Sequence, residues 1–119
     1  MRLATIVSAF ALASGVTAWS DFADASKCGA KTPDINNAIG KFCSKKDLVV
    51  PSRYANRGVS VNGWHVAISG KCNPPQWVPF EYCRTQFARM CANGNGQGLN
   101  NKRFGRNGCQ GWHIDRKGK

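Results

Sequence analysis

Six cysteines are spread over a chain of only 119 residues. An even number of cysteines in so short a chain predicts three disulfides, because bridges supply stability that a small exported domain cannot draw from its core alone. Each bridge contributes roughly 2–4 kcal/mol to the free energy of unfolding. Composition alone leaves the pairing open among all six: Cys28, Cys43, Cys72, Cys83, Cys91 and Cys109.

The N-terminus predicts export into an oxidising compartment. Arg2 supplies a positive charge, the following residues are mostly apolar, and Val16-Thr17-Ala18 offers small residues for cleavage. This is the layout of a secretory signal peptide, and its apolar run is short for a membrane span. The alternative is a buried N-terminal helix. We expect a signal peptide at 1–18, with a weaker cleavage site near Ala25, and one secreted, extracellular, monomeric domain at 19–119 without a stable membrane anchor.

The chain is strongly basic, with a formal net charge of +11 at pH 7. Between Arg84 and Lys119, eight lysines and arginines stand against one acid, Asp115. Such a surface attracts nucleic acid, acidic polysaccharide or phospholipid headgroups. The plainer alternative is that the charge only keeps an exported protein in solution.

The sequence predicts a first amphipathic helix over residues 33–46. Thr32 can cap it with its hydroxyl, and Pro33 suits the first helical position. Cys43 ends the apolar face, so we expect its disulfide to join this helix to the sheet. Residues 19–27 form a polar lead-in that should be mobile until Cys28 ties it down. The apolar residues recur at helical spacing: Ile35, Ala38, Ile39, Phe42 and Cys43.

A second helix is predicted over residues 80–92. Cys83 and Cys91 lie eight positions apart on it, which is about 12 Å along a helix axis. A disulfide requires Cα atoms within about 7 Å, so these two cysteines cannot pair with each other.

Extended structure is predicted for residues 59–69 and 109–114. Asn62-Gly63 signals a hairpin turn inside the first segment, and the alternative is one strand with a bulge at Gly63. Two helices and a small antiparallel sheet, stapled by three disulfides, predict an α+β fold. Trp77, among prolines, is the tryptophan most expected to be exposed.

Residues 93–108 are rich in Gly and Asn and predict a long loop, which in small domains is usually functional or disordered. Arginine forks pair with phosphate or uronate groups, and aromatic rings stack on bases or sugars. The loop is therefore a candidate binding segment, although Phe104 would equally suit the core. The candidate binding residues are Lys102, Arg103, Phe104, Arg106 and, in the following strand, Trp112.

Two nearly identical tetrapeptides, Gly63-Trp64-His65-Val66 and Gly111-Trp112-His113-Ile114, suggest a second hypothesis. Alternation along strands would place both histidines on the face opposite the tryptophans. One neutral imidazole and one imidazolium beside lysines can cleave RNA by acid–base catalysis. A variant of this hypothesis uses Glu81 as the base. The simpler alternative is that His65 and His113 are ordinary polar residues on the solvent-exposed face of a sheet.

Other chemistries find little support in the sequence. Neither a Cys-x-x-Cys pair nor histidines at zinc-finger spacing are present, so we expect no metal site. Hydrolase, zinc-protease and phosphate-loop motifs are absent, and no cofactor is expected. Carboxylates are too sparse in the second half of the chain for a glycosidase pair.

The chain resembles the small secreted cysteine-rich proteins of filamentous fungi, many of which are effector-like. The signal peptide, the proline-capped helix ending in Phe42-Cys43, the helix containing Phe87 and Cys91, and residues 106–110 carry this resemblance. It implies export toward a host or competitor, with a role in virulence or in modulating host defence, and it supplies no catalytic residues. We therefore expect a secreted cationic protein that binds a host or competitor protein, an anionic polysaccharide or nucleic acid. The alternatives are a cationic ribonuclease and a membrane-active antimicrobial or toxin.

Overall fold

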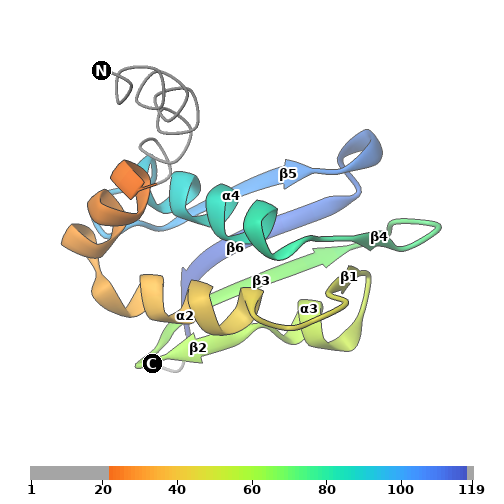
Figure 1. Ribbon diagram of the computed structural model, residues 1–119, viewed down its shortest axis with the longest axis horizontal. Coiled ribbons are helices and arrows are strands. Elements are labelled where there is room, and N and C mark those ends of the chain that lie inside the picture. The colour runs from red at the N-terminus through yellow and green to blue at the C-terminus, as the bar shows by residue number, and fades with distance from the viewer. Residues whose placement is uncertain (1–21, 118–119) are drawn as a thin grey trace, which may run out of the picture.

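A four-stranded antiparallel sheet forms one layer of the protein (Figure 1). The structure is a computed structural model that describes residues 22–117, so the predicted signal peptide at 1–18 lies outside the described residues. The fold is α+β, as the sequence predicts. In spatial order the strands are β2 (Val59–Val61), β3 (Trp64–Gly70), β6 (Gln110–Arg116) and β5 (Asn100–Phe104).

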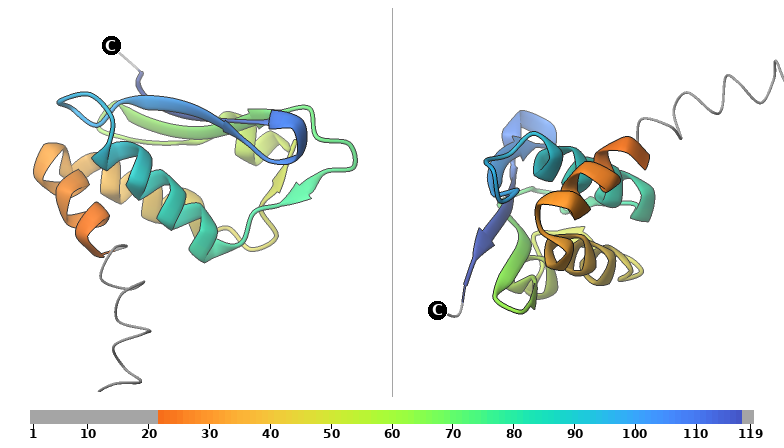
Figure 2. Two further views of the ribbon diagram at one scale, coloured as in Figure 1. Left: turned by 90° about the horizontal axis from the view of Figure 1, so that it is seen from above. Right: turned by 90° about the vertical axis from the view of Figure 1, so that its left-hand side faces the viewer.

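Two amphipathic helices cover one face of this sheet, as Figure 2 shows in its left view. They are α2 (Pro33–Cys43) and α4 (Phe80–Ala92), and both match the predicted helices apart from the last turn of the first. Between the layers lies the core, centred on Trp112, whose ring centroid is 4.6 Å from that of Phe87. Phe42 from α2 meets Phe87 edge to face, with ring centroids 5.7 Å apart.

The described part of the chain contains further elements that the sequence does not announce. Residues 22–31 are helical, so the predicted mobile lead-in at 19–27 is wrong for residues 22–27, while residues 19–21 lie outside the described residues. Helix α3 (Arg53–Arg57) is a single short turn that lies beside β3. Strands β1 (Val49–Val50) and β4 (Gln76–Trp77) form a separate two-stranded sheet.

The β2–β3 connection is a two-residue hairpin turn, which confirms that prediction over the bulged alternative. Val61 pairs with Trp64, and the two residues between them have positive φ angles, 52° at Asn62 and 86° at Gly63. Such turns match the twist of the strands and favour Asn-Gly.

Three disulfides join distant parts of the chain. Cys28–Cys91 ties the helix at 22–31 to α4, Cys43–Cys83 ties α2 to α4, and Cys72–Cys109 ties the loop after β3 to the start of β6. Cys83 and Cys91 take different partners, as helix geometry predicts. The expectation that Cys43 joins α2 to the sheet is wrong, because Cys43 is bonded to Cys83 of α4, the helix that packs beside α2.

Capping in the structure differs from the sequence prediction. Thr32 precedes α2, but its hydroxyl donates to the carbonyl of Gln97 at 2.8 Å and does not cap the N-terminus of α2. Lys31 instead closes the C-terminal end of α4: its Nζ lies 2.8 Å from the carbonyl of Ala92 and 3.0 Å from that of Cys91. A cation at this end of a helix satisfies unpaired carbonyls and complements the dipole.

Two aromatic side chains at the edge of the core differ in exposure: Tyr54 is half-buried and Trp77 is exposed. Tyr54 stacks on Phe42 and donates to the carbonyl of that residue at 2.9 Å, and burial raises the pKa of its phenol. Trp77 is 66% exposed, as predicted from its proline-rich surroundings. None of the helices in residues 22–117 combines the length and apolar character needed to cross a bilayer.

Candidate anion-binding site

A basic pocket lies at the end of the sheet drawn on the right in Figure 1. The loop after β3 and the turn between β5 and β6 meet there, and the Cys72–Cys109 disulfide holds them together. The pocket has a volume of about 420 Å³. We call it the cationic pocket; its lining residues are Lys71, Asn73, Pro74, Pro75, Gln76, Arg106, Asn107 and Cys109.

The chemistry of this lining favours an anion. Lys71 and Arg106 contribute two positive charges, both side chains are exposed, and no acidic residue is among the lining residues. Two asparagine amides add neutral hydrogen-bond donors beside them. Ammonium, guanidinium and amide groups together suit an oxyanion such as phosphate, sulfate or carboxylate.

The turn that presents Arg106 has an unusual backbone for which its sequence is suited. The φ angles are 83° at Gly105, 54° at Asn107 and 67° at Gly108, in the left-handed region that glycine and asparagine tolerate best. The chain forms a short 3₁₀ turn over Arg106–Gly108, and its helical geometry is interrupted at Asn107. The predicted loop at 93–108 is not continuous, because strand β5 (Asn100–Phe104) occupies its middle.

A chain of hydrogen bonds connects the core to the pocket. The indole Nε1–H of Trp112 donates to Gln110 Oε1 at 2.8 Å, and Gln110 Nε2 donates to Gln76 Oε1 at 2.9 Å. The backbone N–H of Arg106 donates to the same oxygen at 3.3 Å. Gln76 thus positions the turn that carries Arg106 against the sheet.

The opposite, outer face of the sheet carries a second group of polar side chains next to the pocket. Strand register places Ser69 and Arg103 on either side of Gly111, and Ala67 and Asn101 on either side of His113. If Gly111 carried a Cβ, that atom would lie 3.1 Å from Ser69 Oγ, 3.2 Å from Arg103 Nη1 and 3.4 Å from His113 Nε2. Three side chains from three strands therefore converge over one glycine, and we call Ser69, Arg103 and His113 the outer-face cluster.

The outer-face cluster and the cationic pocket are contiguous. Cβ and Cδ of Arg103 lie within 3.9 Å of the position that a Cβ on Gly108 would occupy, while its guanidinium reaches over Gly111. Gly108 belongs to the turn that carries Arg106. The aliphatic stem of Arg103 thus lies beside the turn that carries Arg106, while its charged end belongs to the outer-face cluster.

His65 and His113 lie on the same face, as the strand pattern predicts, but their surroundings differ. His65 pairs with Asp115 across the strands, and its Nδ1 lies 3.1 Å from Asp115 Oδ1. Its Nε2 lies 2.9 Å from the carbonyl of Arg57 in α3, and only 6% of the residue is exposed. Both ring nitrogens are thus occupied within the protein, which leaves no nitrogen of His65 to act on a substrate in this conformation.

His113 is half-buried, and its Nε2 lies 3.0 Å from Ser69 Oγ. The carboxylate considered as an alternative base, Glu81, belongs to the first turn of α4. That helix covers the face of the sheet opposite His113, so the two side chains do not meet. The structure brings His113 together with Arg103 and Ser69 instead.

The remaining predicted binding residues separate across the sheet. Lys102 and Phe104 share the inner face with Trp112, because β5 alternates its side chains between the two faces. Lys102 borders a hollow of about 290 Å³ beside α4. Phe104 packs edge to face on Trp112, and Trp112 is fully buried, so the assignment of Trp112 to a binding surface is wrong.

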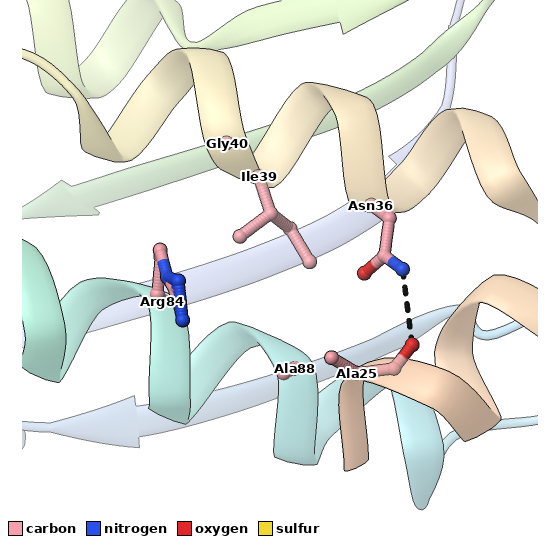
Figure 3. A pocket seen from close by; sticks show the side chains of 6 residues that line it. All are labelled: Ala25, Asn36, Ile39, Gly40, Arg84 and Ala88. Atoms are coloured by element: carbon pink, nitrogen blue, oxygen red, sulfur yellow. Dashed lines mark hydrogen bonds between the residues drawn. The ribbon is translucent and has the colours of Figure 1, made fainter. Parts of the chain in front are cut away.

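A further cavity lies within the helical layer and is shown in Figure 3. It has a volume of about 200 Å³ and is bordered by Ile39, Gly40 and Ala88, with Arg84 at one end. The amide of Asn36 points across it but donates to the carbonyl of Ala25 at 3.0 Å. This cavity offers a ligand few uncommitted polar groups.

Sequence reasoning found Arg103, Arg106 and His113 but missed Ser69 and Lys71. The signal for Lys71 was its position next to Cys72, because the bridge from Cys72 to Cys109 brings it beside Arg106. The position of Lys71 is informative only once the disulfide pairing is known. Among the described residues, no group of three or more His, Cys, Asp or Glu side chains gathers where a metal ion could be held.

Comparison of the chain with protein-family models, with curated proteins and with solved structures finds no match.

Proposed function

We propose that this protein is a secreted binding protein that captures an anionic partner at the cationic pocket. The observation that carries the proposal is the pairing of Lys71 and Arg106 in the lining of one pocket, with no acidic residue among the lining residues. Opposing loops held by a disulfide keep these charges in place, so little conformational entropy is lost on binding. An excess of positive charge over the whole chain also steers anions toward it.

The partner class follows from the resemblance to exported fungal proteins together with this chemistry. We infer that the partner belongs to a host or competitor and presents repeated negative charges, as acidic polysaccharides and nucleic acids do. Engaging it would modulate host defence or virulence. RNA cleavage is the weaker candidate, because His65 is fully engaged and leaves a single imidazole on the outer face.

The proposal is tested by measuring binding of two labelled polyanions, a heparin oligosaccharide and a short single-stranded oligodeoxynucleotide. The double variant Lys71→Ala/Arg106→Ala should weaken binding of at least one of them about tenfold. For the oligonucleotide, the slope of log affinity against log salt should fall by about 1.4, since roughly 0.7 is lost per phosphate contact removed.

The matched control is Lys27→Ala/Lys41→Ala, which removes the same charge from exposed positions on the helical layer. This control should bind nearly as the wild type does. Equal weakening by both double variants would show that only net charge matters, and no weakening by the pocket variant would refute the site.

A further inference from the structure

We propose that a second hollow, which we call the aromatic cleft, binds a sugar ring of a polysaccharide. It lies where the loop from α2 to β1 faces the linker from β4 to α4. Two aromatic side chains, Trp77 and Phe80, line it together with the polar residues at 44–47. Its volume is about 380 Å³, within the roughly 300–1,000 Å³ of small-molecule sites. The cleft shares no lining residue with the cationic pocket, so the sugar site does not rest on the proposed function.

Both rings of the cleft are open to a ligand. Trp77 is 66% exposed and Phe80 is 49% exposed, although large aromatic side chains usually contribute to the core. Two such rings beside one hollow leave apolar surface in water that a bound ligand would cover. The face of an aromatic ring is negative, and the C–H groups on one side of a pyranose carry small positive charges. A sugar therefore stacks favourably on rings of this kind.

The polar groups at the rim suit a sugar better than a nucleotide. The carboxylate of Asp47 accepts hydrogen bonds from sugar hydroxyls, and the ammonium of Lys46 donates to them. Both side chains are exposed, and the ion pairs within residues 22–117 involve neither of them. Lys45 also lines the cleft, and its Nζ lies 5.7 Å from the centroid of the Tyr54 ring. Asp47 would repel the phosphates of a nucleic acid, so this rim favours a ligand rich in hydroxyl groups.

The fold holds the two rings in place before a ligand arrives. Trp77 pairs with Val49 in the β1–β4 sheet, and Phe80 begins α4. The Cys43–Cys83 disulfide ties the first turn of α4 to the end of α2, and Cys43 itself lines the cleft. Walls that are fixed in this way reduce the conformational entropy lost on binding.

The aromatic cleft and the cationic pocket flank the same strand, β4. Neighbouring residues of a strand point to opposite faces, and Gln76 lines the cationic pocket while Trp77 lines the aromatic cleft. A polysaccharide of uronic acids offers rings to the cleft and carboxylates to the pocket. The two sites together therefore favour an acidic polysaccharide as the partner, a step that rests on the proposed function.

The test measures binding of a short labelled oligogalacturonide and of its methyl ester, which keeps the sugar rings but loses the charges. Trp77→Ala and Phe80→Ala should each weaken binding of both forms about tenfold, because each removes a stacking surface. Trp77→Phe keeps a ring and should retain most of the binding, while Asp47→Asn should weaken both forms about threefold. The matched control is Tyr82→Leu, which removes a 42% exposed ring of α4 outside the cleft and should bind as the wild type does.

Tryptophan fluorescence reports contact with the cleft independently of affinity. Acrylamide quenches exposed tryptophans, and the bound methyl ester should protect Trp77 from it. In Trp77→Phe this protection should disappear although the ligand still binds. Thermal unfolding verifies that each variant is folded. If Trp77→Ala loses its fold, Trp77→Phe and Asp47→Asn, which change less volume, still decide the result.

The outcomes separate the sugar site from the proposed function. Unchanged binding of the methyl ester by Trp77→Ala and Phe80→Ala, or equal weakening by Tyr82→Leu, refutes the sugar site. Lys71→Ala/Arg106→Ala should weaken binding of the acidic form only. If that variant binds every polyanion as the wild type does while Trp77→Ala is impaired, the proposed function fails and the sugar site stands. If Trp77→Ala weakens binding of an oligodeoxynucleotide more than that of the methyl ester, the cleft stacks nucleobases and the sugar assignment is overturned.

Discussion

At the scale of single residues, the two histidines show how register and local packing can assign different roles to similar sequences. His65 and His113 sit in matching tetrapeptides and share a face of the sheet. His65 is enclosed because α3 lies against β3 and presents the carbonyl of Arg57 to its ring. His113 lies between Ala67 of β3 and Asn101 of the edge strand β5, and it remains half-buried, with its Nε2 3.0 Å from Ser69 Oγ.

This difference predicts opposite effects of two alanine substitutions. His65→Ala leaves the Arg57 carbonyl without its partner and should lower the free energy of unfolding by about 1–3 kcal/mol. His113→Ala should change it by less than about 0.5 kcal/mol, as most partly exposed substitutions do. Urea denaturation measures both. Equal losses in the two variants would contradict the structural role given to His65.

At the scale of elements, the ends of the helices are stabilised by residues far away in the sequence. Lys31 illustrates this, because its ammonium lies within 3.2 Å of carbonyls from Cys91, Ala92, Gly94 and Asn95. One side chain thereby ties the end of α4 and the loop after it to the helix at 22–31. The Cys28–Cys91 disulfide reinforces the same junction.

Removing the charge of Lys31 should therefore loosen this junction. Lys31→Met keeps most of the side-chain volume but leaves the carbonyls at the end of α4 without their cation, and we expect a loss of about 1–3 kcal/mol in the free energy of unfolding. Lys27→Met, an exposed lysine on the same helix, is the control for charge and should be nearly neutral. Hydrogen exchange should quicken at residues 89–95 only in the first variant. Uniform protection in both would argue against the cap.

At the scale of the whole molecule, two of the three disulfides close loops of similar length but have different roles. Cys43–Cys83 joins two helices that already pack together, with a sequence separation of 40. Cys72–Cys109, with a separation of 37, holds the two loops of the cationic pocket. Chain entropy therefore predicts nearly equal stabilisation from each, while only the second bears on the site.

A pair of double variants separates stability from function. Cys43→Ala/Cys83→Ala and Cys72→Ala/Cys109→Ala should each lower the free energy of unfolding by about 4 kcal/mol. At a temperature where both remain folded, polyanion binding should fall markedly only in Cys72→Ala/Cys109→Ala. Equal retention of binding in the two would show that the pocket loops need no bridge.

Local sequence signals determined those parts of this protein that depend on neighbouring residues. Periodicity placed α2 and α4 because one face of a helix must be buried, and Asn62-Gly63 placed the hairpin because its positive φ angles suit few other residues. Alternation along the strands likewise put His65 and His113 on one face. Helix length even excluded the Cys83–Cys91 pair.

Only the tertiary structure decided which distant segments meet, and the site consists of such meetings. Disulfide pairing brought Lys71 to Arg106, strand register brought Ser69 and Arg103 to Gly111, and the approach of α3 enclosed His65. Each depends on contacts between residues remote along the chain, whose free energies arise from burial and packing of the whole fold. Local propensities carry no information about such contacts, so the site emerges only when the chain is folded.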